Sequence, residues 1–409
     1  MYLRDMVERL VERCASCFSD PAERLQFLQR ATVSDEGGQG RTRFTRAFGW
    51  ALARHEFVRK LLPIAGLATL ITVALGIAVV VEGGSRQAAI SPSIPPVNRQ
   101  AEEQLNASPN AEAPELPPRV WLVEATQGFD LYSNGLRVEN QFATATGPRT
   151  YLVFARNLRE LEAPERRSSP AGIVFHTTES HMAPFEEDHN QGLRRAGEGL
   201  LEYVCRKRAY HFVIDRFGRV FRIVRESDHA NHAGHSVWAD QNWIYVNLNE
   251  SFLGVAFEAQ TRREDEPSPL NPAQVHAGRI LTDMLRARFG IAAENCVAHG
   301  QVSINPGARQ AGYHTDWSAH LPFRELGLRD NYSQPLPSVV LFGFETDPSF
   351  SHDASPVFRQ ALLVAESDIQ QEAAARNLAI ERYRETLQER YKDTIKALAA
   401  STPTQENSQ

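Results

Sequence analysis

Two histidines in this chain occupy matching positions, because each follows a short apolar run and opens a polar turn. His176 follows Ile173-Val174-Phe175, and His299 follows Cys296-Val297-Ala298. A short buried strand can deliver a side chain to the rim of a sheet in this way. One histidine at a strand end is more often structural than catalytic, so the interpretation depends on further ligands at the same edge.

A third group comes from the polar loop after His299, which ends in His314-Thr315-Asp316. Two histidines and a carboxylate would give zinc three protein ligands and leave a fourth position for water, which is the catalytic form of a zinc site. Nitrogen and oxygen donors suit zinc, although the sequence does not exclude other metals.

The elements that must position these side chains form a mixed α and β pattern over residues 170–325. About 150 residues are enough to bury a core of their own. The patterns predict the following elements: strands at Gly172–Phe175, His211–Asp215, Arg219–Val224, Phe252–Glu258 and Cys296–His299, and helices at Gly192–Arg206 and Pro272–Arg288. Asn271 is the expected N-cap of the second helix, and Gly290 is its expected end.

Segments on either side of this domain carry patterns of their own. Residues 118–165 predict a small β region, possessing strand patterns at Val120–Val123, Phe129–Tyr132 and Tyr151–Phe154 and a hairpin turn at Ser133-Asn134-Gly135. Residues 335–400 predict a strand at Val339–Phe344 and one long amphipathic helix at Val357–Ala400. That helix could pack on its own domain or bind a partner protein as a coiled coil.

The N-terminal part predicts a membrane anchor. Leu61–Val81 is a 21-residue apolar run without a charge, long enough to span the roughly 30 Å hydrocarbon core. Arg54, Arg59 and Lys60 precede it and Glu82 follows, so the positive-inside rule places a helical segment at 1–60 in the cytoplasm. Residues 83–117 have the composition of a disordered tether. We therefore expect a single-pass protein of the bacterial inner membrane with its later domains outside the cytoplasm.

Charge and cysteine content exclude some classes. A net charge of −6 argues against a general nucleic-acid binder. Cys14 and Cys17 form a CxxC without a second pair, which disfavours a structural zinc site. Cys205 and Cys296 fall in the domain expected outside the cytoplasm, where a disulfide is permitted, but the sequence does not decide whether they pair.

Residues 170–318 resemble the amidase-2 family of zinc N-acetylmuramoyl-L-alanine amidases, which shares its fold with peptidoglycan recognition proteins. The motifs that carry the resemblance are Ile173–Thr178, Tyr210–Gly218, His232-Ala233-Gly234, Asn249–Val255 and Ala298-His299. The resemblance implies a mixed α/β (α+β) sheet with flanking helices. It also implies Zn²⁺ as cofactor, peptidoglycan or muropeptide as substrate, and hydrolysis of the amide between N-acetylmuramic acid and L-alanine.

The resemblance implies that His176 and His299 are zinc ligands. The loop before residue 316 is longer than usual and lacks the common Asp-Pro-Gly. The family's Lys-x-Asp frame is filled here by His314-Thr315-Asp316, which implies Asp316 on zinc and His314 at the developing oxyanion. The swapped assignment, with His314 on zinc, stays open.

The family also needs a group that handles the proton of the attacking water. Some members use the Tyr of the Tyr-His motif, here Tyr210, and others use a Glu where this chain has Ala256. The resemblance therefore implies the tyrosine type, with Glu258 and His211 interpreted as structural. His232 belongs to a loop that lines the substrate groove in relatives, but Asn231 precedes it where many relatives have Trp.

Three functions remain in competition. The first is a membrane-anchored zinc amidase, favoured by His176, His299 and the acid at position 316. The second is a module that binds muropeptide without cutting it; relatives of this kind typically lack one zinc ligand. The third is an envelope scaffold whose C-terminal helix docks a partner protein.

Overall fold

The computed structural model describes residues 117–156, 164–180, 182–234 and 236–401. The predicted cytoplasmic segment, the apolar run at 61–81, the tether apart from its last residue, and the CxxC pair therefore lie outside the described residues. Within the described part, no helix is both long enough and apolar enough to cross a membrane.

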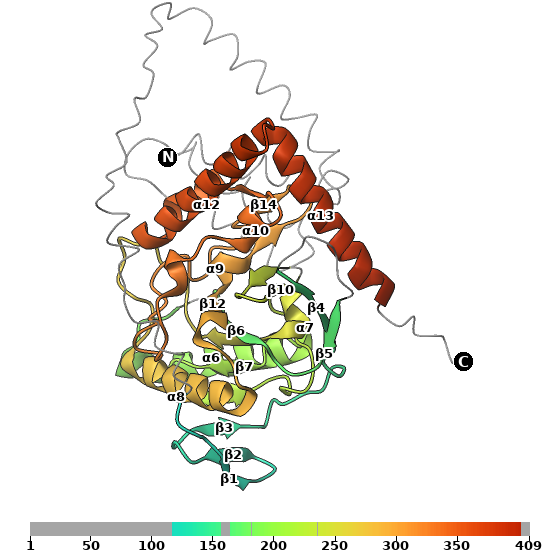
Figure 1. Cartoon of the computed structure of the whole chain (residues 1–409). Helices are drawn as coiled ribbons and strands as arrows, with labels where there is room; N and C mark the ends of the chain where they lie inside the picture. The colour runs from blue at the N-terminus through green and yellow to red at the C-terminus, as the bar shows by residue number, and fades with distance from the viewer. Residues whose placement is uncertain (1–116, 157–163, 181, 235, 402–409) are drawn as a thin grey trace, which may run out of the picture. The chain divides into compact units, whose positions relative to one another are not determined.

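A mixed sheet of eight strands forms the centre of the described unit (Figure 1), in the order β1-β2-β3-β8-β7-β11-β6-β12. The strands are β1 Leu122–Ala125, β2 Phe129–Tyr132, β3 Arg137–Glu139, β6 Gly172–Thr177, β7 Phe212–Ile214, β8 Val220–Arg222, β11 Phe252–Phe257 and β12 Cys296–Ala298. β7, β11, β6 and β12 run parallel to one another, and β8 returns antiparallel to β7. The strands predicted around the histidines are all present.

The predicted small β region divides between two sheets. β1, β2 and β3 extend the main sheet, because β3 pairs with β8. The predicted hairpin turn joins β2 to β3, and its Gly135 has φ 83. β4 (Tyr151–Ala155) instead belongs to a second sheet, ordered β5-β4-β10-β9. The other strands of that sheet, which the sequence did not predict, are β5 Glu165–Arg167, β9 Val237–Ala239 and β10 Trp243–Val246.

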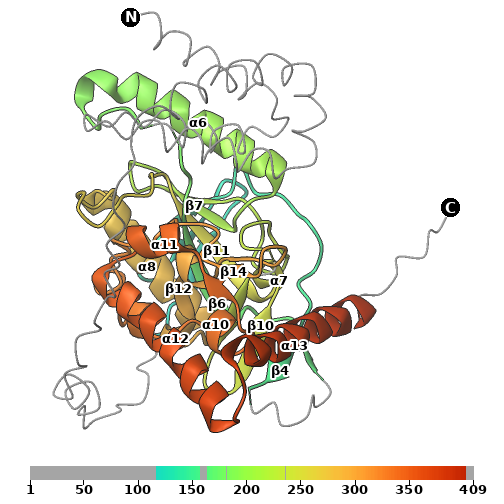
Figure 2. The ribbon, with the colours of Figure 1, turned by 90° about the horizontal axis from the view of Figure 1, so that it is seen from above.

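The central strands of the main sheet are buried on both faces. In β6, Ile173 and Phe175 belong to the largest core cluster, together with Leu281 of α8 (Pro272–Phe289). Val174 points the other way, into a cluster with residues of the second sheet. On that same side α6 (Asn190–Lys207) packs through Leu201. Figure 2 shows α6 along one side of the strands, and α8 packs on the opposite face through Leu281. This is the predicted mixed sheet with flanking helices.

Helix α8 begins and ends as predicted. The Asn271 side chain accepts a hydrogen bond from Gln274 N at 3.0 Å, and the Gln274 side chain accepts one from Asn271 N at 3.4 Å. This reciprocal capping box satisfies backbone donors that the first turn leaves unpaired. Gly290 follows in the left-handed conformation with φ 67, which ends the helix at low steric cost.

The C-terminal segment differs from the prediction at two points. The strand expected at Val339–Phe344 is wrong: Pro337 begins the short helix α10 (Pro337–Val340). The single helix expected at Val357–Ala400 is two, α12 (Pro356–Ala375) and α13 (Ile380–Ser401). Asn377 separates them with φ 53, a conformation that asparagine adopts more readily than most residues.

The two helices pack on their own domain, which is the first of the two alternatives that the sequence left open for the C-terminal helix. Phe358 and Leu362 of α12 and Leu387 and Tyr391 of α13 belong to the largest core cluster. The remaining short elements are α7 Leu248–Ser251, α9 His299–Val302, α11 Pro348–Asp353, β13 Ile304–Asn305, β14 Gln310–Ala311, β15 Glu345–Thr346, η1 Glu187–His189, η2 Ala293–Asn295 and η3 Asn331–Ser333.

The cysteine pair does not form a disulfide. Both Cys205 and Cys296 are free thiols. Cys296 is buried in the cluster that contains α8, whereas Cys205 lies beside the cluster under α6 on the other face of the sheet. The sheet itself therefore separates the two sulfur atoms.

Candidate metal centre

Strand pairing brings the two histidines together. Ala298 at the end of β12 pairs with Phe175 of β6, so the next residues along the two parallel strands, His299 and His176, become neighbours. Their ring centroids are 4.4 Å apart. Both side chains are buried, at 1% and 5% exposure.

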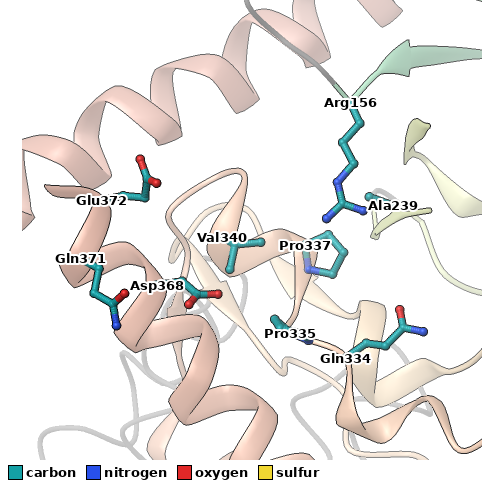
Figure 3. Close-up of a pocket in the computed structure, with 9 residues that line it drawn as sticks. All are labelled: Arg156, Ala239, Gln334, Pro335, Pro337, Val340, Asp368, Gln371 and Glu372. Atoms are coloured by element: carbon teal, nitrogen blue, oxygen red, sulfur yellow. The ribbon is translucent and has the colours of Figure 1, made fainter. Parts of the chain in front are cut away.

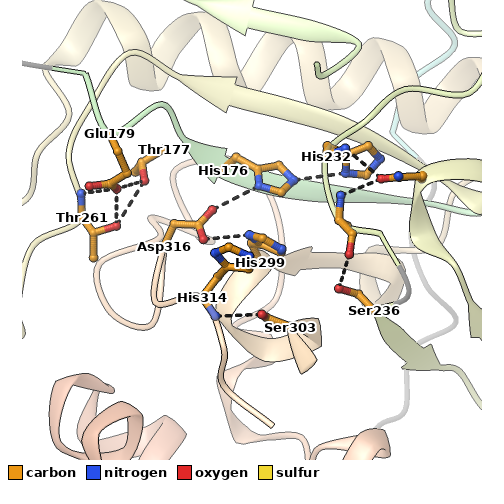
Figure 4. A network of polar contacts seen from close by, with 12 residues as sticks. His176, Thr177, Glu179, His232, Ser236, Thr261, His299, Ser303, His314 and Asp316 are labelled. Carbon is orange, nitrogen blue, oxygen red and sulfur yellow. Dashed lines mark hydrogen bonds and ion pairs between the residues drawn. The ribbon is translucent and has the colours of Figure 1, made fainter. Parts of the chain in front are cut away.

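Asp316 reaches both imidazoles (Figure 4). Its Oδ2 lies 3.1 Å from His176 Nδ1, and its Oδ1 lies 2.7 Å from His299 Nδ1. Gly300 N donates to the Asp316 carbonyl at 2.9 Å, which ties the loop to the residue after His299. The ligand atoms of the three residues all lie within 4.8 Å of one another. The three ligands predicted from the sequence thus converge.

Electrostatics keeps His176 and Asp316 in the protonation states that bind metal. Burial, reinforced by the charge that His299 can carry, lowers the pKa of His176 to about 4. Burial alone would raise the pKa of Asp316, but the two neighbouring imidazoles outweigh it and lower that pKa well below its usual range. A neutral imidazole and an ionised carboxylate are the forms that coordinate a divalent cation.

The donor set fits zinc. Two imidazole nitrogens and one carboxylate provide the N₂O combination of a catalytic zinc site with an open fourth position. His299 Nδ1 faces Asp316 at 2.7 Å, whereas His299 Nε2 is buried without a hydrogen-bond partner among the described residues. A buried ring nitrogen in that state calls for a further partner, such as an ion or a water molecule.

His314 lies beside the cluster. Its ring stacks on that of His299, with centroids 4.8 Å apart and planes 23° apart. Its backbone N donates to Ser303 Oγ at 2.8 Å. Only Asp316 of the two candidates belongs to the converging group, which favours Asp316 over His314 as the third ligand.

Tyr210 contacts His176 from another direction. Its ring centroid is 5.1 Å from that of His176. Its φ is 64, a left-handed conformation that costs a bulky residue on the order of 1–3 kcal/mol. Burial, together with the negative charges of Asp316 and Glu179, raises the pKa of Tyr210. The phenol is therefore a neutral hydrogen-bond donor near neutral pH.

His232 lies behind His176. Its Nδ1 is 3.2 Å from His176 Nε2. The loop that carries it is fixed by the Asn249 side-chain oxygen, which accepts from the backbone N of His232, Ala233 and Gly234 at 2.8, 2.7 and 2.8 Å. His232 is the residue predicted to contact substrate, and its ring lies edge-on to that of His176, with centroids 5.3 Å apart.

The residues interpreted as structural have structural partners. His211 Nδ1 accepts from Gly254 N at 2.9 Å, and the Glu258 carboxylate accepts from Arg216 N at 3.1 Å. Ala256 pairs with His176 across β11 and β6 and is fully buried. The position beside His176 where other members carry a Glu therefore holds a methyl group.

Sequence reasoning missed a carboxylate at the rim of the site. Glu179 has φ 52, and its Oε1 accepts from Thr261 N at 2.8 Å, from Thr261 Oγ1 at 2.5 Å and from Thr177 Oγ1. Burial raises the pKa of Glu179. Its position three residues after His176 was a signal, but nothing in the sequence pointed to Thr261.

A separate hollow of about 410 Å³ lies where α10 and α12 approach the second sheet (Figure 3). Its charged lining side chains include Arg156, which donates to the Asp240 carbonyl at 2.6 Å, and Glu372, which pairs with Arg376 at 2.9 Å. None of the three converging residues lines it. We assign no chemistry to this hollow.

Comparison with known proteins identifies the class. Residues 166–316 match the family model of N-acetylmuramoyl-L-alanine amidases, so the chain carries a domain of the amidase-2 family. The protein is accordingly a hydrolase of the N-acetylmuramoyl-L-alanine amidase class. The match ends at Asp316, the last of the three converging residues. No curated protein sequence matches the chain.

Several solved structures are similar to part of the chain. AmpDH3 from Pseudomonas aeruginosa, in complex with anhydromuramic pentapeptide, is 21% identical over 44% of this chain and 68% of its own, with a TM-score of 0.30. AmiD from E. coli is 17% identical over 60% of this chain and 98% of its own, with a TM-score of 0.33. The Drosophila peptidoglycan recognition protein SD is 17% identical over 39% and 84%, with a TM-score of 0.24.

Proposed function

We propose that this amidase depends on zinc and cleaves the amide between the lactyl group of N-acetylmuramic acid and L-alanine in peptidoglycan. The observation that carries the proposal is the convergence of His176, His299 and Asp316 inside the segment that matches the family. The three side chains are buried, the pKa of His176 is lowered to about 4 and the pKa of Asp316 is lowered well below its usual range, which supports metal binding more than a purely structural ion pair.

The proposed roles follow from the geometry. His176, His299 and Asp316 would hold zinc, which supplies a Lewis acid and lowers the pKa of a coordinated water. Tyr210, kept neutral by its raised pKa, would donate a hydrogen bond at the reacting water and guide its proton. His314, stacked on His299, would donate to the oxyanion of the tetrahedral intermediate. The C–N bond then breaks, and the L-alanine amine leaves with a proton.

The experiment uses the full-length protein with purified peptidoglycan, a chelator, and zinc added back. We expect release of stem peptides with a free L-alanine amine, loss of that release with chelator, and recovery with zinc. His176→Ala should be inactive, whereas His352→Ala, whose side chain is 80% exposed on α11, should match the wild type. Activity that persists in the chelator would contradict zinc dependence.

A binding module that does not cut remains the second candidate, and Ala256 beside His176 is the observation that favours it. This function predicts that peptidoglycan sediments with the protein while no stem peptide is released, even with zinc present. The scaffold function has less support, because many apolar side chains of α12 and α13, including Phe358 and Leu387, pack into their own core.

We also propose that the amidase domain is anchored to the bacterial inner membrane and works outside the cytoplasm. The uncharged run at 61–81, the basic residues before it and the polar tether after it support this proposal. A reporter fused after residue 117 tests the topology. Activity only of a reporter that works in the cytoplasm would contradict it.

A further inference from the structure

A second hollow lies at the edge of the main sheet opposite the metal centre. It has a volume of about 700 Å³, and its walls include the hairpin of β1 and β2, Pro170 before β6 and Ser227 after β8. His176 lies near the other end of β6, and six residues of a strand span about 20 Å. The hairpin also precedes residues 166–316, the stretch that matches the family. The hollow is therefore separate from the three converging residues.

A buried network of charges forms one wall of this hollow. Arg222 donates to both oxygens of the Glu226 carboxylate, at 3.1 and 3.0 Å. It also donates to Asp130 Oδ2 at 2.8 Å and to Asn140 Oδ1. The Arg222 and Glu226 side chains are only 8% and 10% exposed. Burying charges costs free energy even when they are paired, and these bonds occupy Arg222, so a ligand must be held by other groups.

Tyr132 offers such a group. Its hydroxyl oxygen accepts from Arg222 Nη2 at 3.4 Å and from Arg288 Nη1 at 3.2 Å. The side chain lines the hollow, and the residue is 3% exposed. In none of the hydrogen bonds between described residues is this hydroxyl the donor, although a hydroxyl carries one hydrogen to donate. Tyr132 can therefore donate one hydrogen bond to a ligand in the hollow.

Two more donors line the hollow nearer to solvent. Arg225 is exposed, and the Arg288 side chain is 49% exposed. With Arg222, three arginines line the hollow against the two carboxylates of Asp130 and Glu226, which leaves one positive charge. One carboxylate on a ligand would balance this charge, whereas a doubly charged phosphate would exceed it. Guanidinium groups match the planar geometry of a carboxylate.

Apolar side chains complete the walls. Leu122 of β1 lines the hollow and stays 49% exposed. Phe289, at the end of α8, lines it as well and packs against the main core. These walls suit an aliphatic group beside the carboxylate rather than a second charge, because a charge placed against apolar surface loses hydration without gaining a partner.

We propose that this hollow binds a small organic monocarboxylate with an aliphatic group, such as the C-terminal residue of a short peptide. The carboxylate accepts hydrogen bonds from Tyr132, Arg225 and Arg288, and the aliphatic group lies against Leu122 and Phe289. This site does not depend on the proposed zinc centre, which lies at the other edge of the sheet.

The test uses metal-free full-length protein in a chelator and a ligand-observed NMR titration with N-acetyl-alanyl-alanine. The probe with an amide in place of its carboxylate is the matched control ligand. We expect saturable binding of the acid and clearly weaker binding of the amide. Tyr132→Phe should weaken binding of the acid about 10-fold or more. Arg225→Gln should weaken it about 3- to 5-fold, because this side chain is exposed to water.

Arg194→Gln on α6, which also replaces an exposed arginine, should bind the acid as the wild type does. Tyr132→Phe removes an acceptor from two guanidinium groups, so its thermal unfolding is compared with that of the wild type. Arg225→Gln changes only an exposed side chain and tests the site even if Tyr132→Phe is unstable.

Four results would overturn the proposal: no saturable binding of the acid at millimolar concentrations, equal binding of the amide, displacement of the acid by an equal concentration of inorganic phosphate, or wild-type affinity in Arg225→Gln and in a folded Tyr132→Phe. Binding that appears only when zinc is added would place the carboxylate at the metal centre. That result would also overturn the proposal, while zinc dependence would stand.

Discussion

The buried, uncharged state of His176 predicts how the metal-free protein loses stability in acid. Its pKa falls from 6.5 to about 4 on folding. Between these pH values His176 is therefore protonated in the unfolded chain and neutral in the folded chain. A lowered folded pKa gives stability that is complete above pH 6.5 and is lost as the pH falls toward 4. Lowering the pH from 7 to 4.5 should remove about 2.5 kcal/mol of the free energy of unfolding through this group.

The assay is urea unfolding in chelator at pH 7 and at pH 4.5, followed by the fluorescence of the buried Trp238 and Trp317. Other buried histidines act in the same direction, so the comparison is between wild type and His176→Asn. The wild type should lose about 2.5 kcal/mol more than the variant over this interval. Equal losses would refute the assignment of a neutral, buried His176 in the metal-free protein.

Three further changes test the site. Asp316→Asn removes the charge between the imidazoles and should weaken zinc binding at least about 10-fold in a competition assay; unchanged affinity would point to His314 as the third ligand. Gly254→Ala would place a Cβ 2.6 Å from His232 Cγ and should lower the free energy of unfolding by about 1–3 kcal/mol, whereas an unchanged free energy of unfolding would argue against the close contact. Tyr210→Phe should lower kcat about 100-fold or more with zinc affinity unchanged, whereas a wild-type kcat would move the proton-handling role to another group such as Glu179.

The sequence predicted the elements whose signals are local. β6 and β12 are apolar runs that end at a histidine, and α8 has its cap, its first-turn proline and its terminal glycine within one stretch. β9 and β10 were missed because three or four residues carry too little periodicity to be separated from a loop. The break at Asn377 interrupts an otherwise helical pattern, and a single asparagine is a weak stop signal.

The site residues differ in the same way, because some have local sequence signals and others depend on contacts between distant parts of the chain. His176, His299 and Asp316 could be predicted because strand ends and a known motif order bring them to one edge. The contact between His176 and His232 joins residues 56 apart in the chain, and it depends on which way a loop turns.

The glycine that makes room for the His232 ring lies on another strand, β11. A motif can name such a residue without saying what it touches. For this reason the sequence predicted a substrate contact for His232 but could not predict that its ring also lies against His176.

The central claim is that one zinc ion, held by His176, His299 and Asp316, makes this domain an amidase. The most direct measurement is a titration of the metal-free full-length protein with zinc while stem-peptide release from peptidoglycan is followed. We predict that the rate rises linearly and stops rising at one zinc per chain, and that His299→Ala shows no rise. Release that is already maximal without zinc, or that rises equally in His299→Ala, would contradict the account.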